Sequence, residues 1–184
     1  MSFNFETLSN GAILITPKVN GDQRGFFLET YKKSIFEKYN IGLFVQDNHS
    51  LSIKGVLRGI HFQNPKPQGK LIRCINGSIW DVAVDLRKDS PTFKKWIGVT
   101  LNSENNQMLW VPEGYGHAFL TLSDVAEINY KCTNEYDSTL DASILWNDKD
   151  INISWGINNP ILSSKDEKAK TLKEHLSCKT NTLF

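Results

Sequence analysis

The feature of the sequence that most restricts its fold is a succession of short β-rich runs along most of the chain. The runs are GAILITPKV, GFFLETY, LFVQDNHSLS, GVLRGIHFQ, KLIRCI, SIWDVAVDL, KKWIGVTL, QMLWVP, HAFLTL and AEINYKC. Many short strands at close spacing are typical of a β-sandwich or jelly roll. Helical periodicity is confined to residues 33–39 and to the tail, where Ser164 and Glu167 have capping-box spacing before a stretch that ends at Leu176. We therefore predict an all-β jelly-roll β-sandwich with short peripheral helices.

The dipeptide Asn76-Gly77, between two of these runs, is the preferred sequence of a two-residue hairpin turn. Pairing the flanking runs through that turn puts Lys70 and Asp81 on one face of the sheet, and Trp80 and Val82 on the other. Charged side chains on one face are unusual for a packed core. The pattern therefore predicts a polar, ligand-binding cavity against that face.

Composition limits the class of protein. With 184 residues, 40% of them apolar and 22% charged, the chain fits one globular domain over residues 1–184. The formal net charge is +1, and no run of Lys and Arg exceeds two residues. This balance lacks the basic field of a nucleic-acid-binding protein, so we expect no nucleic-acid partner.

Cysteine usage and hydropathy indicate a cytoplasmic protein. Cys74, Cys132 and Cys178 are far apart, odd in number and without CxxC spacing, which argues against a disulfide framework or a zinc site. The first residues contain no basic segment followed by an apolar stretch, and no run of 18 apolar residues occurs elsewhere. We expect no association with a membrane.

Two segments, GVLRGIHFQ and WVPEGYGHAFL, place a histidine beside glycines at the end of a predicted strand. Pro112, Gly114 and His117 have the P-x-G-x-x-H spacing of the second metal-binding motif of cupins. The first motif requires a His-x-His pair, but residues 61–63 are His-Phe-Gln. Because glutamine is a poor replacement for imidazole, we predict a cupin without a metal and without another cofactor.

Arg58 and His61 have opposite parity, so a regular strand would point them to opposite faces. A β-bulge at Gly59 would bring both side chains to one face. The alternative is that His61 only ends a strand and that Arg58 is a solvated edge charge. The two segments alone leave both interpretations open.

Nine segments, in order from about residue 21 to about residue 166, resemble the dTDP-4-dehydrorhamnose 3,5-epimerase family. They are GDQRGFFLETY, FVQDNHS, VLRGIHFQ, QGKLIRC, GSIWDVAVDLRKDSPTFKKWIGV, LWVPEGYGHAFLTLS, AEINYK, ILWND and LSSKD. The resemblance implies an isomerase of the rhamnose pathway that inverts carbons 3 and 5 of dTDP-4-dehydro-6-deoxy-D-glucose, giving dTDP-4-dehydro-L-rhamnose.

The resemblance also implies catalytic roles. His61 of the RGxHxQ motif corresponds to the family's base, and Asp166 of the LSxKD motif would orient and polarise it. Tyr130 of the xYK motif corresponds to the proton donor on the opposite sugar face, and Lys70 of the QGK motif would contact the sugar near its ketone. Each residue type suits its role, because a neutral histidine accepts a proton, a cation stabilises the enolate, and a phenol returns a proton.

Further residues are implied to bind the nucleotide diphosphate sugar. Arg24 and Arg58 would contact the diphosphate and sugar, and His117 would contact the sugar near its ketone. Glu29 and a turn formed by Gln46, Asp47 and Asn48 would contact the nucleotide, and Tyr136 would stack on its base. The remaining implied contacts are Phe27, Asp141 and Lys165. Arg24 and Glu29 lie on predicted edge strands suited to exchange between subunits, which favours a homodimer.

Several alternatives remain open from the sequence alone. Lys70 and Asp81 could form a structural pair, Tyr130 could be a core aromatic, and Tyr136 a surface aromatic. His49 is interpreted as structural and His175 as an exposed helix residue.

Departures from the family pattern concern the substrate. Glu135-Tyr136 stands where many members have two aromatic residues, and Asp141 where many have Glu. These differences leave open an epimerase of a single carbon or of a CDP- or GDP-linked 4-keto sugar. A sugar-binding cupin without catalytic activity is the alternative from another class.

Overall fold

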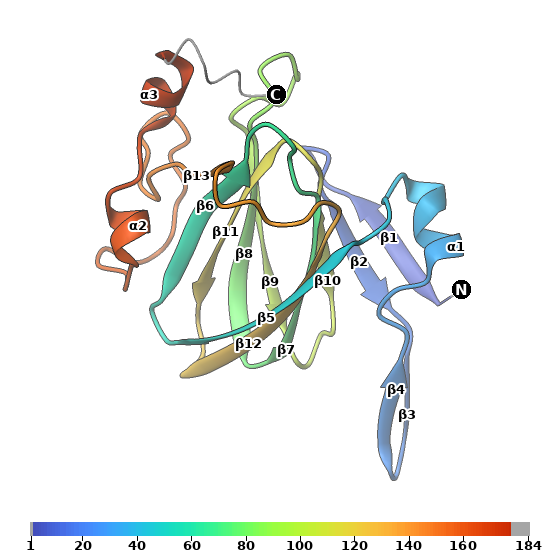
Figure 1. Cartoon of the computed structure of the whole chain (residues 1–184). Helices are drawn as coiled ribbons and strands as arrows, with labels where there is room; N and C mark the ends of the chain where they lie inside the picture. The colour runs from blue at the N-terminus through green and yellow to red at the C-terminus, as the bar shows by residue number, and fades with distance from the viewer. Residues whose placement is uncertain (1, 178–184) are drawn as a thin grey trace.

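The structure of the protein is a computed structural model, and it describes residues 2–177 (Figure 1). Its strands are β1 (Phe3–Thr7), β2 (Ile13–Pro17), β3 (Val19–Asp22), β4 (Gly25–Leu28), β5 (Gln46–Ile53), β6 (Leu57–Gln63), β7 (Lys70–Asn76), β8 (Ser78–Asp85), β9 (Trp96–Asn102), β10 (Met108–Val111), β11 (Tyr115–Thr121), β12 (Val125–Cys132) and β13 (Asp141–Ser143). Its helices are α1 (Lys33–Phe36), the 3-10 helix η1 (Glu37–Tyr39), α2 (Ser164–Glu167) and α3 (Leu172–Ser177).

Two antiparallel sheets face each other and form the body of the molecule. One sheet has six strands in the order β1-β2-β10-β7-β12-β5, and the other has five in the order β13-β6-β11-β8-β9. The helices lie at the margins of the sandwich, and the hairpin β3–β4 projects away from it (Figure 1). The predicted all-β jelly-roll sandwich with short peripheral helices is confirmed.

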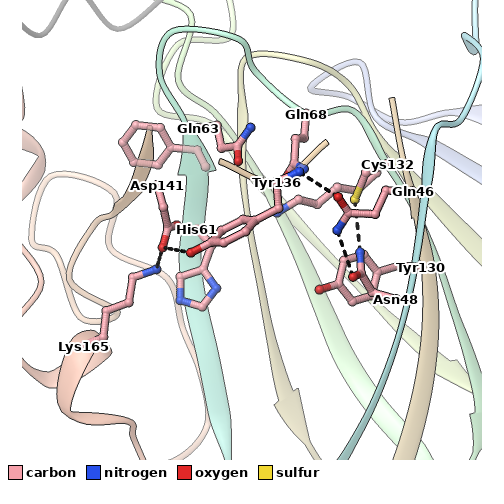
Figure 2. A pocket seen from close by; sticks show the side chains of 12 residues that line it. Gln46, Asn48, His61, Gln63, Gln68, Tyr130, Cys132, Tyr136, Asp141 and Lys165 are labelled. Carbon is pink, nitrogen blue, oxygen red and sulfur yellow. Dashed lines mark hydrogen bonds and ion pairs between the residues drawn. The ribbon is translucent and has the colours of Figure 1, made fainter. Parts of the chain in front are cut away.

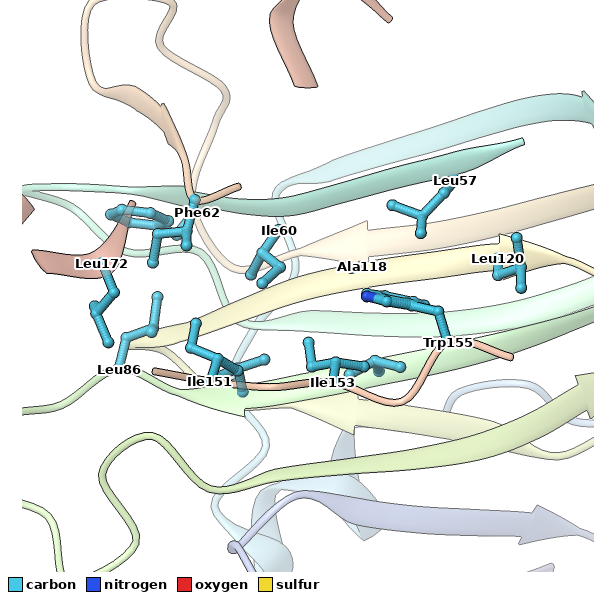
Figure 3. Packing of buried hydrophobic residues seen from close by; sticks show 13 residues of the cluster. Leu57, Ile60, Phe62, Leu86, Ala118, Leu120, Ile151, Ile153, Trp155 and Leu172 are labelled. Atoms are coloured by element: carbon cyan, nitrogen blue, oxygen red, sulfur yellow. The ribbon is translucent and has the colours of Figure 1, made fainter. Parts of the chain in front are cut away.

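Apolar side chains fill the space between the sheets and also cover both outer faces. Ile72 and Leu109 of the six-stranded sheet pack against Ala83 of the five-stranded sheet in the interior. The outer face of the five-stranded sheet is covered by the C-terminal segment, whose Ile153 and Trp155 appear in Figure 3. A third cluster that includes residues from β1, β2 and α1 covers part of the outer face of the six-stranded sheet. The layers hold the inner faces of both sheets in fixed positions around the cavity described below.

The predicted hairpin at Asn76-Gly77 is wrong. The strands on either side belong to different sheets, so the connection crosses the sandwich instead of pairing its neighbours. Gly77 does adopt the positive φ that such a turn needs, at +74°, and an added Cβ would lie 2.1 Å from the carbonyl oxygen of Val125. Lys70 and Asp81 nevertheless both lie in the buried interior, on facing sheets. The expected polar face is therefore real, although it is divided between two sheets.

Of the two interpretations left open for Arg58 and His61, the structure shows the β-bulge at Gly59. Arg58 lies opposite Phe119 and His61 opposite His117, so β6 contains one residue more than β11 across this interval. Gly59 has a φ of +127°, and a Cβ there would lie 2.3 Å from the Cβ of Ala118. Only glycine fits this position, and the extra residue changes the direction of the side chains that follow it.

The C-terminal helices differ from the prediction in detail. The N-cap of α2 is Ser163, one residue before the predicted position, and its Oγ accepts the backbone N–H of Asp166 at 3.1 Å. His175 is buried, with its Nε2 3.0 Å from the carbonyl oxygen of Ser143, so its predicted exposure is wrong.

His49 is largely exposed and lies 3.1 Å from Glu127. None of the helices in residues 2–177 is long and apolar enough to cross a membrane.

Candidate active site

A cavity of about 340 Å³ opens between the two sheets (Figure 2). Its walls come from strands β5, β6, β7, β12 and β13. The segments after β6 and β12 and the helix α2 complete them. The lining residues are Gln46, Asn48, His61, Phe62, Gln63, Gln68, Lys70, Tyr130, Cys132, Tyr136, Asp141 and Lys165. Most of these side chains are polar, so the cavity suits a hydrophilic ligand better than an apolar one.

His61 forms a close pair with a carboxylate distant in sequence. Its Nε2 lies 2.5 Å from Oδ1 of Asp166, and the hydroxyl of Ser163 donates to the other carboxylate oxygen at 2.9 Å. Burial lowers the pKa of His61, and Asp166 partly opposes that shift. Burial is the largest influence on Asp166 and raises its pKa, but the bond and charge of His61, the bond from Ser163 and the charge of Lys165 together outweigh burial and leave that pKa below the ordinary value. The pair therefore combines an ionised carboxylate with a histidine that stays neutral near pH 7.

Tyr130 and Lys70 reach the same cavity from the six-stranded sheet, opposite His61. On neighbouring strands, Tyr130 lies opposite Ile72 and Lys70 opposite Cys132. Burial raises the pKa of Tyr130, which keeps the phenol protonated. Burial lowers the pKa of Lys70, because little water remains to solvate its ammonium group. A proton acceptor and a proton donor thus lie on facing sheets with an amine beside the donor.

Tyr136, Asp141 and Lys165 meet at one side of the cavity (Figure 2). The Tyr136 hydroxyl donates to Oδ2 of Asp141 at 3.1 Å, and the Lys165 ammonium pairs with the same oxygen. Tyr136 is 54% exposed, so much of its ring remains open to a ligand. Gln46 and Asn48 lie on the β5 side, and they begin a strand instead of forming the predicted turn.

His117 forms a second histidine–carboxylate pair. Its Nε2 lies 2.7 Å from Oδ1 of Asp81, and both residues are buried. His117 is not among the residues that line the cavity, although it lies directly opposite His61 on the neighbouring strand. From the sequence, Asp81 was considered only as a partner of Lys70. The closeness of His117 and Asp81 depends on how β11 and β8 pair, and the sequence alone did not give that register.

Other residues predicted to bind substrate lie away from the cavity. Arg24, Phe27 and Glu29 lie on or next to the projecting hairpin, where Arg24 pairs with Asp22. Asp47 points elsewhere and pairs with Lys131 at 2.8 Å.

Arg58 is also outside the cavity lining, and it donates to the hydroxyl of Ser52 at 3.1 Å. Its charge nevertheless reaches the site, because it opposes the increase in the pKa of Tyr130. Arg58 is therefore placed to act on the rim of the site.

Four lining residues were not predicted from the sequence: Phe62, Gln63, Gln68 and Cys132. Phe62 and Gln63 directly follow His61 in the motif, which was the available signal. Gln63 does not act as a metal ligand would, because its amide bonds to backbone groups of two loops. Among residues 2–177, no three His, Cys, Asp or Glu side chains form a group that could hold a metal ion.

The sandwich and its cavity define a cupin-type protein equipped for proton transfer, with a histidine–carboxylate pair, a phenol and a buried amine. The chain belongs to the dTDP-4-dehydrorhamnose 3,5-epimerase family, whose model matches residues 6–174.

Similar proteins from several organisms carry this activity or a related one in their names. The dTDP-4-dehydrorhamnose 3,5-epimerase of Shigella flexneri is 54% identical over 158 residues, covering 84% of this chain and 87% of that protein. The dTDP-6-deoxy-D-glucose-3,5-epimerase of Legionella pneumophila Philadelphia 1, solved in complex with dTDP-4-keto-L-rhamnose, is 42% identical with a TM-score of 0.89, covering 93% of each chain. A dTDP-4-dehydrorhamnose 3-epimerase of Streptomyces niveus is 37% identical over 164 residues, covering 87% of this chain and 79% of that protein.

Proposed function

We propose that the protein is an isomerase that inverts carbons 3 and 5 of dTDP-4-dehydro-6-deoxy-D-glucose and produces dTDP-4-dehydro-L-rhamnose. The observation that carries this proposal is the position of His61 and Tyr130 on facing sheets across one cavity, with Lys70 between the same walls. Inversion requires a base on one face of the sugar and an acid on the other. The two relatives named as 3,5-epimerases support the choice of substrate.

The reaction begins when neutral His61 removes the proton from a carbon next to the ketone. The electron pair of that C–H bond forms a double bond to the carbonyl carbon, the carbonyl π pair moves to the oxygen, and the ammonium of Lys70 stabilises the resulting enolate. Asp166 stabilises the imidazolium that His61 becomes. Tyr130 then donates its proton to the same carbon from the opposite face, and exchange with water restores both groups. A second cycle at the other flanking carbon completes the product.

The remaining polar groups of the cavity would hold the nucleotide diphosphate. Tyr136 offers an exposed ring on which a base can stack, and Gln46 and Asn48 supply amide groups beside it. Lys165 is a cation at the same side of the cavity, suited to a phosphate oxygen. Asp141 holds Lys165 and Tyr136 together through one carboxylate oxygen.

We also propose that the protein is a homodimer in which the β3–β4 hairpin of one protomer completes the site of the other. In one chain Phe26 and Phe27 are 61% and 69% exposed on this hairpin, which is costly for large apolar side chains. The edge strand β5 exposes Leu51 and Ile53, which supplies an apolar surface beside the cavity. Exchange of the hairpin would bring Arg24 and its neighbours to that surface.

Complementation tests this arrangement. Coexpressed His61→Ala and Arg24→Ala/Phe27→Ala chains form mixed dimers in which one site has both an intact His61 and an intact partner hairpin. If the hairpin acts across the dimer, the mixed preparation regains up to about a quarter of the parent activity, because about half of randomly formed dimers are mixed and each contains one good site of two. No recovery above the separate variants, with mixed dimers shown by mass, would mean that the hairpin serves its own chain.

The state of the cysteines supports a cytoplasmic location, which we propose on that ground. Cys74 and Cys132 are free and buried. Cys178 lies outside the described residues. Unpaired thiols of this kind persist most readily in a reducing compartment.

Two alternatives follow from the departures named above, and a third comes from another class of protein. The Streptomyces niveus relative is a 3-epimerase, so inversion of a single carbon is the first of them. The second is a CDP- or GDP-linked substrate, and the third is sugar binding without catalysis.

One set of incubations separates these alternatives. The protein is mixed with dTDP-, CDP- or GDP-4-dehydro-6-deoxy-D-glucose, and the product configuration at carbons 3 and 5 is determined by NMR spectroscopy. Inversion at both carbons of the dTDP sugar supports the proposal. Inversion at one carbon, a preference for another nucleotide, or no conversion would overturn it in favour of the corresponding alternative.

A further inference from the structure

The loop between β12 and β13, which carries Tyr136, is held mainly by side-chain amides in its central part. Gln68 donates to the carbonyl oxygen of Asn134 at 2.8 Å, and Gln46 accepts the backbone N–H of Tyr136 at 2.7 Å. Gln63 bonds on both sides of Tyr136: it donates to the carbonyl oxygen of Glu135 at 3.3 Å and accepts the N–H of Asp137 at 2.7 Å. These bonds take the place of the strand pairing that orders the neighbouring elements.

Gln63 is the most enclosed of these three amides. It is 2% exposed, whereas Gln68 is 8% exposed. It lies at the end of β6, two residues after His61, and directly opposite Asp141 on β13. Its amide nitrogen also donates to the carbonyl oxygen of Lys66 at 3.2 Å. One buried side chain thus joins the strand of His61, the loop after that strand and the loop of Tyr136.

The geometry points to Gln63 as a positioning residue for nucleotide recognition. Its bonds to Glu135 and Asp137 fix the backbone on either side of Tyr136, and Asp141 fixes the phenol at the far end of the ring. The ring is therefore oriented over the cavity before a ligand arrives, and less conformational entropy is lost when the ligand binds. This inference rests on the proposed function, because it assumes that Tyr136 contacts the nucleotide.

An amide suits this position better than the imidazole of a metal-binding cupin. The loop presents an N–H and a carbonyl oxygen to Gln63, and a second carbonyl comes from Lys66. A primary amide has one acceptor oxygen and two N–H donors, so it can satisfy all three backbone groups at once. A neutral imidazole has one donor and one acceptor, so it could bond to only one of the two carbonyl oxygens.

The test compares Gln63→Leu with the matched control Gln107→Leu. Gln107 donates to the hydroxyl of Thr16, precedes β10 and does not line the cavity. The dissociation constant for dTDP is measured by calorimetry, together with kcat and KM for the dTDP sugar. We expect Gln63→Leu to raise the dissociation constant and KM by about tenfold, while kcat changes by less than about threefold. The control should change none of them by more than about twofold.

Hydrogen exchange gives a readout that does not depend on the ligand. In Gln63→Leu without nucleotide, peptides covering residues 133–139 should exchange faster, whereas those covering β8 and β11 should exchange at the parent rate. If the loop exchanges normally and dTDP binds as tightly as to the parent, the inference is wrong. Failure of the parent protein itself to bind dTDP would instead overturn the proposed function.

A second variant, Gln63→Glu, covers the case in which the leucine variant does not fold. Its ionised carboxylate can still accept the Asp137 N–H but repels the two carbonyl oxygens. Burial raises the pKa of such a carboxyl, and its protonation restores one donor. The loss of dTDP affinity relative to the parent should therefore shrink as the pH falls from about 8 to about 5.5. A loss that is the same at every pH would contradict the inference.

Discussion

In residues 2–177 two histidines, both on the five-stranded sheet, pair with aspartates, yet only one of the two pairs is placed to act on a ligand. The side chain of His61 is 30% exposed, lines the cavity and is held by Asp166 from a C-terminal helix. The side chain of His117 is 9% exposed and is held by Asp81 from the adjacent strand. The first pair joins two distant parts of the chain at the opening of the sandwich, whereas the second lies wholly within one sheet.

The difference teaches that pairing alone does not define a catalytic base. Both pairs have short contacts between nitrogen and oxygen, so both hold an imidazole in one orientation. Access to the cavity separates them, and it follows from the bulge at Gly59 and from the position of α2. The comparison predicts that changes to the His61 pair act on catalysis, whereas changes to the His117 pair act mainly on stability.

The largest effect is expected for His61→Ala. Without the imidazole neither carbon can be deprotonated, so epimerisation and deuterium exchange should both fall by about 10⁴. The matched change His117→Ala should reduce exchange by less than about 10², because no base is lost. Mass spectrometry of the sugar incubated in deuterated water measures both. An equal loss in the two variants would break the distinction between the pairs.

Tyr130→Phe should separate exchange from inversion. The enolate still forms, and His61 can return a deuteron to the original face, so exchange survives. Inversion should fall by about 10² to 10⁴, as expected for lost acid catalysis. NMR spectroscopy of the recovered sugar gives its configuration, and circular dichroism should show a folded variant. Inversion at the parent rate would mean that another group is the acid.

Asp166→Asn should change the pH dependence as well as the rate. Asp166 raises the pKa of His61 against the larger effect of burial, so removing its charge lowers that pKa further. His61 must be neutral to accept a proton, so the acidic limb of the kcat/KM profile should move to lower pH. The plateau should fall by about 10², because the imidazolium loses its partner. An acidic limb that moves to higher pH would contradict the assignment of His61 as the base.

The smallest catalytic effect is expected for Asp81→Leu. This change leaves the buried His117 without its partner and should lower the free energy of unfolding by about 1–3 kcal/mol. Urea denaturation measures the loss. Among molecules that remain folded, kcat/KM should fall by less than about tenfold. A stable variant with turnover as low as that of His61→Ala would show that the His117 pair belongs to the catalytic machinery.

The sequence predicted the sandwich and most of the cavity, because these depend on residue types and on local order. It offered the bulge at Gly59 as one of two interpretations. The hairpin at Asn76-Gly77 failed because a turn sequence specifies a reversal of the chain, not the sheet to which the next strand belongs. Both strands are covered on both faces, so no polar alternation marked the change of sheet. The burial of His175 was missed for a related reason: it depends on contact with Ser143, more than thirty residues earlier.

The cavity residues that went unnoticed share a physical character. Gln63 and Gln68 act through bonds to loop backbones, and such bonds leave no periodic pattern in a sequence. The pairing of Asp81 with His117 depends on the register of two strands that are not consecutive. The hairpin residues Arg24 and Phe27 show the converse: they were assigned to the substrate, and one chain alone does not bring them to the cavity.

The most direct test of the account counts the deuterons that the sugar gains. The purified protein is incubated with dTDP-4-dehydro-6-deoxy-D-glucose in deuterated water, and the sugar is analysed by mass spectrometry. Proton removal by His61 and return from water-exchanged groups at both flanking carbons predicts a gain of two deuterons. A single deuteron would contradict inversion of both carbons, and an unchanged mass would contradict the assignment of this cavity to enolate chemistry.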